Sequence, residues 1–149
     1  MLTYGTKIQT SPDGKSIAVQ DLMIGQGVFN PFSDGKDEII DILARKVLLH
    51  ETTEELHPVE IARDTFAPGM PCRPLIVSRR QKIMCCPPSQ FKKRRREVEL
   101  VEAVSLPDCK PLTRKEVTYF AIFFAKSRLI VANGSLCATF SADVFQSPQ

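Results

Sequence analysis

The two histidines are the residues whose types could most readily perform metal or acid–base chemistry. His50 and His57 lie in a polar stretch between apolar segments. Four glutamates surround them: Glu51, Glu54, Glu55 and Glu60. Imidazole and carboxylate groups together can hold a metal ion, but a solvated loop accounts for this stretch equally well. Neither histidine is paired with Ser or Cys in a recognisable nucleophile motif, so we expect no metal site and no catalytic residues.

A run of five basic residues is the strongest local charge feature. The candidate partner-binding residues are Lys92, Lys93, Arg94, Arg95 and Arg96. Such a run can neutralise phosphates or contact an acidic protein face, and it also suits a solvated loop. Acidic Glu97 and Glu99 follow at once, and only Phe91 offers a ring for base stacking. The sequence favours a solvated loop, then a protein contact, and last a weak nucleic-acid site.

The cysteines and glycines predict no cofactor. Five cysteines, an odd number at irregular spacing, suit neither a disulfide framework nor a zinc site, and Cys85-Cys86 is not a Cys-x-x-Cys pair. We expect reduced cysteines that act as small core hydrophobes. Gly25-Gln26-Gly27 lacks the helix signature that follows a phosphate-binding glycine loop. The sequence therefore indicates neither a cofactor nor a small-molecule substrate.

Composition predicts one soluble globular domain over residues 1–149. The chain is 43% hydrophobic and 25% charged, with a formal net charge of +3 that does not by itself require nucleic acid or a membrane as partner. The longest apolar run, Phe120 to Ala125, is far shorter than the roughly 20 residues of a spanning helix. The first residues do not resemble a secretion signal. We expect a cytoplasmic or particle-associated protein that makes no membrane contact.

Turn signals predict that any site in this chain is positioned by short strands. They include Pro12-Asp13-Gly14, Ser33-Asp34-Gly35, Pro68-Gly69 and Asn133-Gly134. Alternating or β-branched residues between them predict strands. The strand candidates are Thr6–Thr10, Glu97–Leu100, Glu116–Phe124, Leu129–Val131 and Leu136–Phe140. The fold class is therefore all-β, and Leu129–Val131 is expected to return against Glu116–Phe124 as a hairpin.

Two segments could be helical. Between residues 38 and 49, the apolar side chains fit helical spacing at least as well as a period of two, so helix and strand stay open. Residues 62–66 are a candidate for a short helical turn that ends before Pro68. We expect at most one or two short helices in the whole chain.

The opening of the chain resembles the first block of the Hint superfamily, the autoprocessing fold of hedgehog C-terminal domains and inteins. The matching residues are Gly5-Thr6, Ile8, Thr10, Gly14, Val19-Gln20-Asp21-Leu22, Ile24-Gly25 and Val28. Later stretches look like a bacterial Hint subgroup: Pro58–Ile61, Ala67–Pro71, Arg73–Ser78, Val117–Tyr119 and Leu129–Gly134. The resemblance implies an all-β, hairpin-rich compact fold of two pseudo-symmetric halves.

The chain departs from this pattern at the positions that carry the chemistry. The resemblance implies a thiol or hydroxyl at position 1, where Met1 stands, and a histidine at the position of Gln81. A thioether cannot act as the nucleophile, and a carboxamide cannot shuttle a proton near neutral pH. Gln26 and Ala121 stand where the pattern has an acid and can have a histidine. Ser78 is the one site residue retained, and we expect it to be a hydrogen bonder at a strand end.

Asn133 does not supply the terminal His-Asn pair of intein chemistry. It follows Ala132 and precedes Gly134, and a hairpin turn explains this dipeptide better. The sequence therefore predicts a catalytically inactive Hint-like domain that is a structural or protein-interaction module, for example a subunit of a bacteriophage particle. Its partners would be other protein subunits rather than nucleic acid. Residual autoprocessing of a longer precursor and weak nucleic-acid binding are the alternatives.

Overall fold

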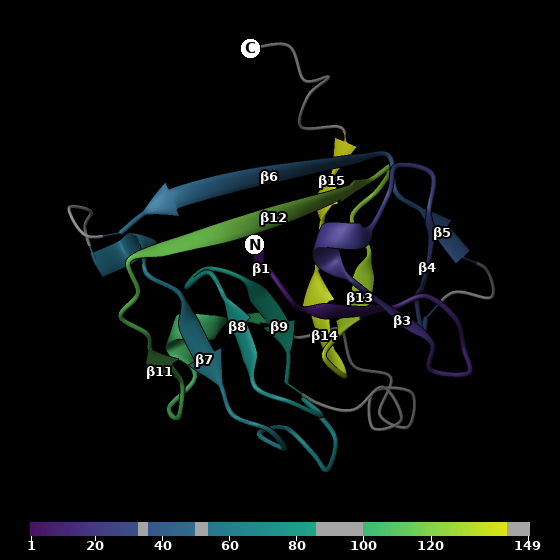
Figure 1. Cartoon of the computed structure of the whole chain (residues 1–149). Helices are drawn as coiled ribbons and strands as arrows, with labels where there is room; N and C mark the ends of the chain where they lie inside the picture. The colour runs from purple at the N-terminus through teal and green to yellow at the C-terminus, as the bar shows by residue number, and fades with distance from the viewer. Residues whose placement is uncertain (33–35, 50–53, 86–99, 143–149) are drawn as a thin grey trace.

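The computed structural model of the chain describes residues 1–32, 36–49, 54–85 and 100–142. Within these ranges the chain is built from strands, as the sequence predicted, and all of them except β6 (Asp41–Leu48) and β12 (Glu116–Phe124) are short (Figure 1). Helical structure among the described residues is limited to three single 3-10 turns: Val19–Asp21, Glu54–Leu56 and Ala103–Ser105. None of the described helices is long and apolar enough to cross a membrane.

The first of two large sheets is organised around a long strand, β12. Its described strands are β11 (Lys110–Pro111), β7 (Val59–Ile61), β8 (Leu75–Val77), β1 (Leu2–Thr3), β12 (Glu116–Phe124) and β15 (Phe140–Ser141), in this order, with β6 (Asp41–Leu48) also paired to β12. β1 lies between β8 and β12, because Leu2 is opposite Val77 on one side and Phe120 on the other. The first residues of the chain are therefore held in the middle of this sheet.

The second large sheet has six described strands, which come from both ends and the middle of the chain. Its described strands, in order, are β10 (Leu100–Glu102), β9 (Lys82–Met84), β14 (Ser135–Ala138), β13 (Leu129–Ala132), β2 (Lys7–Gln9) and β3 (Ser16–Ala18). A separate hairpin joins β4 (Gly27–Phe29) to β5 (Lys36–Glu38). The main core lies between the sheets and includes fully buried Ile8, Leu75, Ile83, Phe124 and Ile130.

The segment that the sequence left open between helix and strand forms a strand. β6 runs antiparallel to β12 over its full length, from Asp41 opposite Phe123 to Leu48 opposite Glu116, and the two strands form the long ribbon at the top of Figure 1. Both faces of β6 carry apolar contacts. Ile42 packs against the main core, whereas Val47 belongs to a second cluster. This two-sided burial places apolar residues at spacings that also fit a helix.

Two local predictions were wrong. Leu129–Val131 does not return against Glu116–Phe124, because β13 pairs with β14 and β2 while β12 pairs with β6, β1 and β15. The chain passes from one sheet to the other between these strands. Residues 62–66 form turns rather than a helix. Asp64 has a positive φ of 63°, and its carboxylate accepts a hydrogen bond from Gly69 N at 2.6 Å, which suits a loop and not a helical turn.

Asn133-Gly134 forms the predicted hairpin turn between β13 and β14. Both residues have positive φ, 48° and 86°, as a tight two-residue hairpin turn requires. The Asn133 side chain also ties the turn to other segments. Its Oδ1 accepts from Lys7 N at 2.8 Å, and its Nδ2 donates to Pro74 O at 3.1 Å.

Candidate functional site

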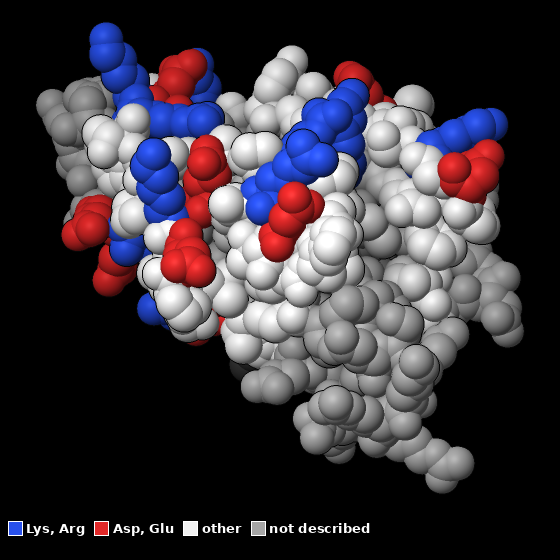
Figure 2. Space-filling view, turned by 90° about the horizontal axis from the view of Figure 1, so that it is seen from below, with Lys and Arg blue, Asp and Glu red and all other residues white. Residues whose placement is uncertain are grey.

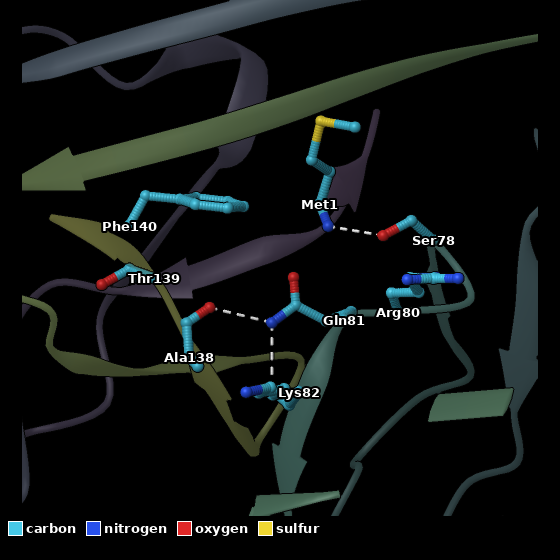
Figure 3. Close-up of a pocket in the computed structure, with 8 residues that line it drawn as sticks. All are labelled: Met1, Ser78, Arg80, Gln81, Lys82, Ala138, Thr139 and Phe140. Atoms are coloured by element: carbon cyan, nitrogen blue, oxygen red, sulfur yellow. Dashed lines mark hydrogen bonds between the residues drawn. The ribbon is translucent and has the colours of Figure 1, made fainter. Parts of the chain in front are cut away.

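A cavity of about 370 Å³ forms where the two sheets meet near the start of the chain. The residues that line it are Met1, Ser78, Arg80, Gln81, Lys82, Ala138, Thr139 and Phe140 (Figure 3). They come from the start of β1, the turn between β8 and β9, and the connection from β14 to β15. The structure thus brings together Met1, Ser78 and Gln81, three of the positions at which the sequence resemblance implied a site; Gln26 and Ala121 do not line this cavity.

Met1 and Ser78 are joined by two hydrogen bonds. Met1 N donates to Ser78 Oγ at 2.6 Å, and Ser78 N donates to Met1 O at 2.9 Å. Ser78 follows directly after β8 and is half-buried. It is therefore the strand-end hydrogen bonder that the sequence predicted, and its hydroxyl oxygen contacts the backbone of residue 1.

The turn from Ser78 to Gln81 contributes Ser78, Arg80 and Gln81 to the cavity lining. Gln81 N donates to Ser78 O at 3.1 Å, and Ala103 N donates to Gln81 O at 2.9 Å. Gln81 is buried, with 5% of the residue exposed. Its side-chain Nε2 donates to Ala138 O at 2.8 Å and to Lys82 O at 3.0 Å. Both amide hydrogens are therefore used. The side-chain oxygen points the other way, toward Met1 (Figure 3).

Burial shifts the proton equilibria of two groups beside the cavity. Desolvation lowers the pKa of the Met1 amino group from 8.0 to about 6. Desolvation raises the pKa of the Cys137 thiol to about 12, with the Met1 amine acting in the opposite direction. The fully buried Cys137 is thus protonated at neutral pH, and a protonated thiol is a poor nucleophile.

The cysteines only partly follow the prediction that they act as core hydrophobes. Cys72, Cys109 and Cys137 are free thiols. Cys137 is fully buried and Cys109 packs against the main core, but Cys72 is exposed. Cys72 lies where the chain passes close to the Asn133-Gly134 turn, and Cys72 N donates to Asn133 O at 2.8 Å. Its place is set by this backbone contact rather than by burial of the thiol.

A second cavity of about 550 Å³ adjoins the first and shares Met1, Ser78 and Arg80 with it. Its other lining residues are Glu55, Leu56, Arg79, Glu102 and Val104. Here Arg79 donates to Glu54 at 3.2 Å, and Tyr119 donates to Leu56 O at 2.8 Å. Burial raises the pKa of Tyr119 to about 12, and the nearby positive charges of Arg79 and Arg114 oppose this shift.

Sequence reasoning missed the cationic and aromatic lining of the first cavity. Arg80 and Lys82 are exposed at its edge, and neither makes an ion pair with a described residue. Phe140 is 39% exposed, and its ring centroid lies 5.3 Å from that of Phe123. The Thr139 hydroxyl bonds with the backbone of Arg128 and points away from the cavity (Figure 3). Arg80 and Lys82 are distant from Phe140 in the sequence, so no local motif predicts that they line one cavity. The pairing of the strands brings them together.

The other sequence candidates lie elsewhere. Ala121 is buried in β12 opposite Leu43, and Asn133 lies in its hairpin turn. No group of metal-binding side chains is found among the described residues, which include His57 but not His50. Lys92–Arg96 falls outside the described residues, so the partner-binding prediction stays untested. On the face seen in Figure 2, the described positive and negative side chains are interspersed.

The first cavity offers polar, cationic and apolar groups that can bind a ligand. The side chains that face it offer the Ser78 hydroxyl, the Gln81 carboxamide, two cationic groups and apolar surface, and none of the lining side chains is an imidazole, thiol or carboxylate. The Met1 amino group is hydrogen-bonded to the Ser78 hydroxyl and is the basic group beside it, and the Met1 side chain is a thioether that cannot act as a nucleophile. These groups can accept and donate hydrogen bonds and attract anions.

Comparison with known proteins places this arrangement in context. A family model described as "Hint domain" matches residues 1–144. The crystal structure of the gp41-1 intein is similar in fold, with a TM-score of 0.56 and 14% identity over 91% of this chain and 95% of that one. The MchDnaB-1 intein gives a TM-score of 0.54 and 13% identity over 93% and 99%. No curated protein matches the sequence.

Proposed function

The chain belongs to the Hint domain family, and we propose that it is a Hint domain that no longer processes its own backbone and instead binds other proteins. Met1 stands where the family resemblance implies a nucleophile. Its thioether has no proton to lose and cannot attack a carbonyl. A fold can persist after its chemistry is lost, because sites are separable from the scaffolds that carry them.

The hydrogen bonding of Gln81 is the observation that carries this proposal. Its carboxamide donates to Ala138 O and Lys82 O, and it occupies the position at which the resemblance implies a proton-transferring histidine. An amide side chain cannot exchange a proton near neutral pH. With both N–H groups committed to backbone carbonyls, Gln81 supports the connection between β9 and β14.

Residual autoprocessing is the second candidate, favoured by the position of Met1 N. This nitrogen lies in the cavity and donates to Ser78 Oγ. If a segment preceded Met1, the bond joining the two would enter the same cavity. A reaction there would need a nucleophile that Met1 cannot supply, and Cys137, the nearby thiol, is fully buried with a raised pKa.

Two more specific functions are predicted from the sequence alone: membership of a larger assembly and binding of nucleic acid. Membership of a larger assembly, for example a bacteriophage particle, is a prediction from the missing catalytic groups. Weak nucleic-acid binding depends on Lys92–Arg96, and its test is an affinity that falls steeply with salt and is lost when these residues are neutralised. Either function would be compatible with a Hint scaffold that lacks self-processing.

The test is to fuse a reporter domain directly before Met1 and follow the intact mass at neutral pH, with and without added thiol. We expect the fusion to stay uncleaved. Cleavage at the bond before Met1 would overturn the proposal in favour of autoprocessing. Light scattering of the chain from its native source tests the second half, because we expect a complex with other proteins and a free monomer would contradict it.

Matched variants make the cleavage result interpretable. Met1→Cys supplies the thiol, Gln81→His supplies the imidazole, and the double variant supplies both. If the missing side chains are the reason for inactivity, the double variant should cleave faster than either single variant. Cleavage of the unsubstituted fusion at the same rate as the double variant would show that Met1 and Gln81 are no obstacle.

A further inference from the structure

The Gln81 side-chain oxygen is an unused hydrogen-bond acceptor that faces the first cavity. The Gln81 residue is 95% buried, and its Nε2 is held by Ala138 O and Lys82 O, which fixes the orientation of the carboxamide. Its Oε1 makes no hydrogen bond with a described residue and points toward Met1 (Figure 3). A backbone N–H of a bound peptide would satisfy this acceptor.

The charge of the first cavity is positive and unbalanced. Arg80 and Lys82 line it, and no acidic residue does. Of the acidic groups nearby, Glu54 pairs with Arg79, whereas Glu55 and Glu102 line the second cavity and not the first. Two free cationic groups beside one cavity favour a carboxylate on the ligand.

Apolar side chains flank the same acceptor. Met1 and Phe140 line the cavity on the side toward which the Gln81 side-chain oxygen points (Figure 3), and Phe140 is 39% exposed although one neighbour, Phe123, packs against it. An exposed aromatic ring beside a cavity gains from burial against an apolar ligand group. The cavity therefore offers an apolar contact next to a cationic one.

The adjoining second cavity gives an extended chain room to continue. It shares Met1, Ser78 and Arg80 with the first, and two exposed apolar residues, Leu56 and Val104, line it. A ligand with apolar groups beside an acid, and with backbone donors between them, fits both cavities better than a small anion does. Extended peptides are recognised by this combination of main-chain bonds and side-chain pockets.

We propose that the two cavities bind an extended segment of a partner protein in which an acidic side chain, held by Arg80 and Lys82, is next to an apolar side chain held between Met1 and Phe140. This inference rests on the proposed function, since it names the surface through which such a module would bind. The occupant is a protein segment supplied by another molecule.

A phage-displayed library of random heptapeptides, selected on the 149-residue chain immobilised at its C-terminus, tests the inference. We expect enriched peptides to carry Asp or Glu beside an apolar residue. The best peptide is then synthesised in its acidic form and with Lys in place of the acid, and binding is measured by fluorescence anisotropy. The double variant Arg80→Glu/Lys82→Glu should bind the acidic peptide at least about tenfold more weakly.

Charge reversal distinguishes a direct contact from a structural effect. The Arg80→Glu/Lys82→Glu variant should bind the Lys peptide more tightly than the unsubstituted chain does, which a misfolded variant could not do. The control Lys15→Glu/Lys110→Glu changes the net charge equally at two exposed positions outside the cavity, and it should leave both affinities within about twofold.

The outcomes separate this inference from the proposed function. Enriched peptides whose binding is unaffected by Arg80→Glu/Lys82→Glu would overturn the docking site but leave a protein-binding module standing. A library without enriched peptides, or with basic ones, would also overturn the site. Self-cleavage of the reporter fusion would overturn the proposed function whatever the peptides do.

Discussion

Met1 and Ser78, separated by 77 positions in the chain, bind each other through a reciprocal pair of hydrogen bonds. The Met1 nitrogen donates to the Ser78 hydroxyl oxygen at 2.6 Å, and the Ser78 backbone nitrogen donates to the Met1 carbonyl at 2.9 Å. This pair extends the β1–β8 contact by one residue and closes one wall of the cavity. The cavity wall thus depends on a long-range contact rather than on a local turn.

Ser78→Ala should lower the free energy of unfolding by about 1 kcal/mol, because it removes one partly buried hydrogen bond. The backbone half of the pair remains. Urea unfolding measures the change, and Ser78→Thr is the matched control because it keeps the hydroxyl. An unchanged midpoint in Ser78→Ala would mean that the hydroxyl contact contributes nothing to stability.

The stability of the chain should fall as the pH drops from 8 to 6. Desolvation lowers the pKa of the Met1 amine to about 6, so in this range the unfolded chain binds a proton that the folded chain does not. The group's contribution is therefore fully present above pH 8 and lost as the pH falls through 6. The loss amounts to roughly 2–3 kcal/mol, since one pKa unit corresponds to about 1.36 kcal/mol.

An Nα-acetylated chain is the control for this pH effect. Its first nitrogen is an amide that does not titrate but can still donate to Ser78. Every other titrating group is common to the two chains, so the difference between their unfolding free energies isolates Met1. Parallel pH profiles for the acetylated and free chains would contradict the prediction.

Gln81→Ala should destabilise the fold by about 2–3 kcal/mol, because Ala138 O and Lys82 O each lose a buried donor. Gln81→Glu keeps the shape but replaces the donor with a carboxylate. Its cost should grow between pH 5 and pH 8 as the buried acid ionises beside two carbonyl oxygens. Thermal unfolding at both pH values tests this, and a pH-independent cost for Gln81→Glu would show that the carboxamide donor is unimportant.

Gly134→Ala should cost more stability than Gly14→Ala, although both glycines have positive φ, 86° and 93°. A Cβ at Gly134 would lie 2.6 Å from Gly69 O and 3.1 Å from Cys72 N, whereas a Cβ at Gly14 meets nothing within 4 Å. Gly14→Ala therefore reports the backbone strain alone, about 1–3 kcal/mol. Equal losses in urea unfolding would mean that the crowding at Gly134 is relieved without cost.

Much of the fold could be predicted because turns and strands depend on local chemistry. The Asn133-Gly134 dipeptide predicts its hairpin through the positive φ that both residues adopt. It is harder to predict from the sequence which strand another strand pairs with. Leu129–Val131 looks like a return arm for Glu116–Phe124, yet the tight turn at Asn133-Gly134 pairs it with β14 instead. Strand pairing depends on contacts between distant segments, and these contacts cannot be read from a single sequence.

The all-β class, the family resemblance and the chemical character of the site could be predicted from residue types, since the side chains of Met1, Ser78 and Gln81 limit what they can do wherever they lie. Tertiary structure alone decided that Arg80, Lys82 and Phe140 line one cavity with them. It also decided that residues 41–48 form a strand rather than a helix. The physical reason is that both outcomes depend on register across the sheets, which arises from burial and backbone pairing between segments far apart in the chain.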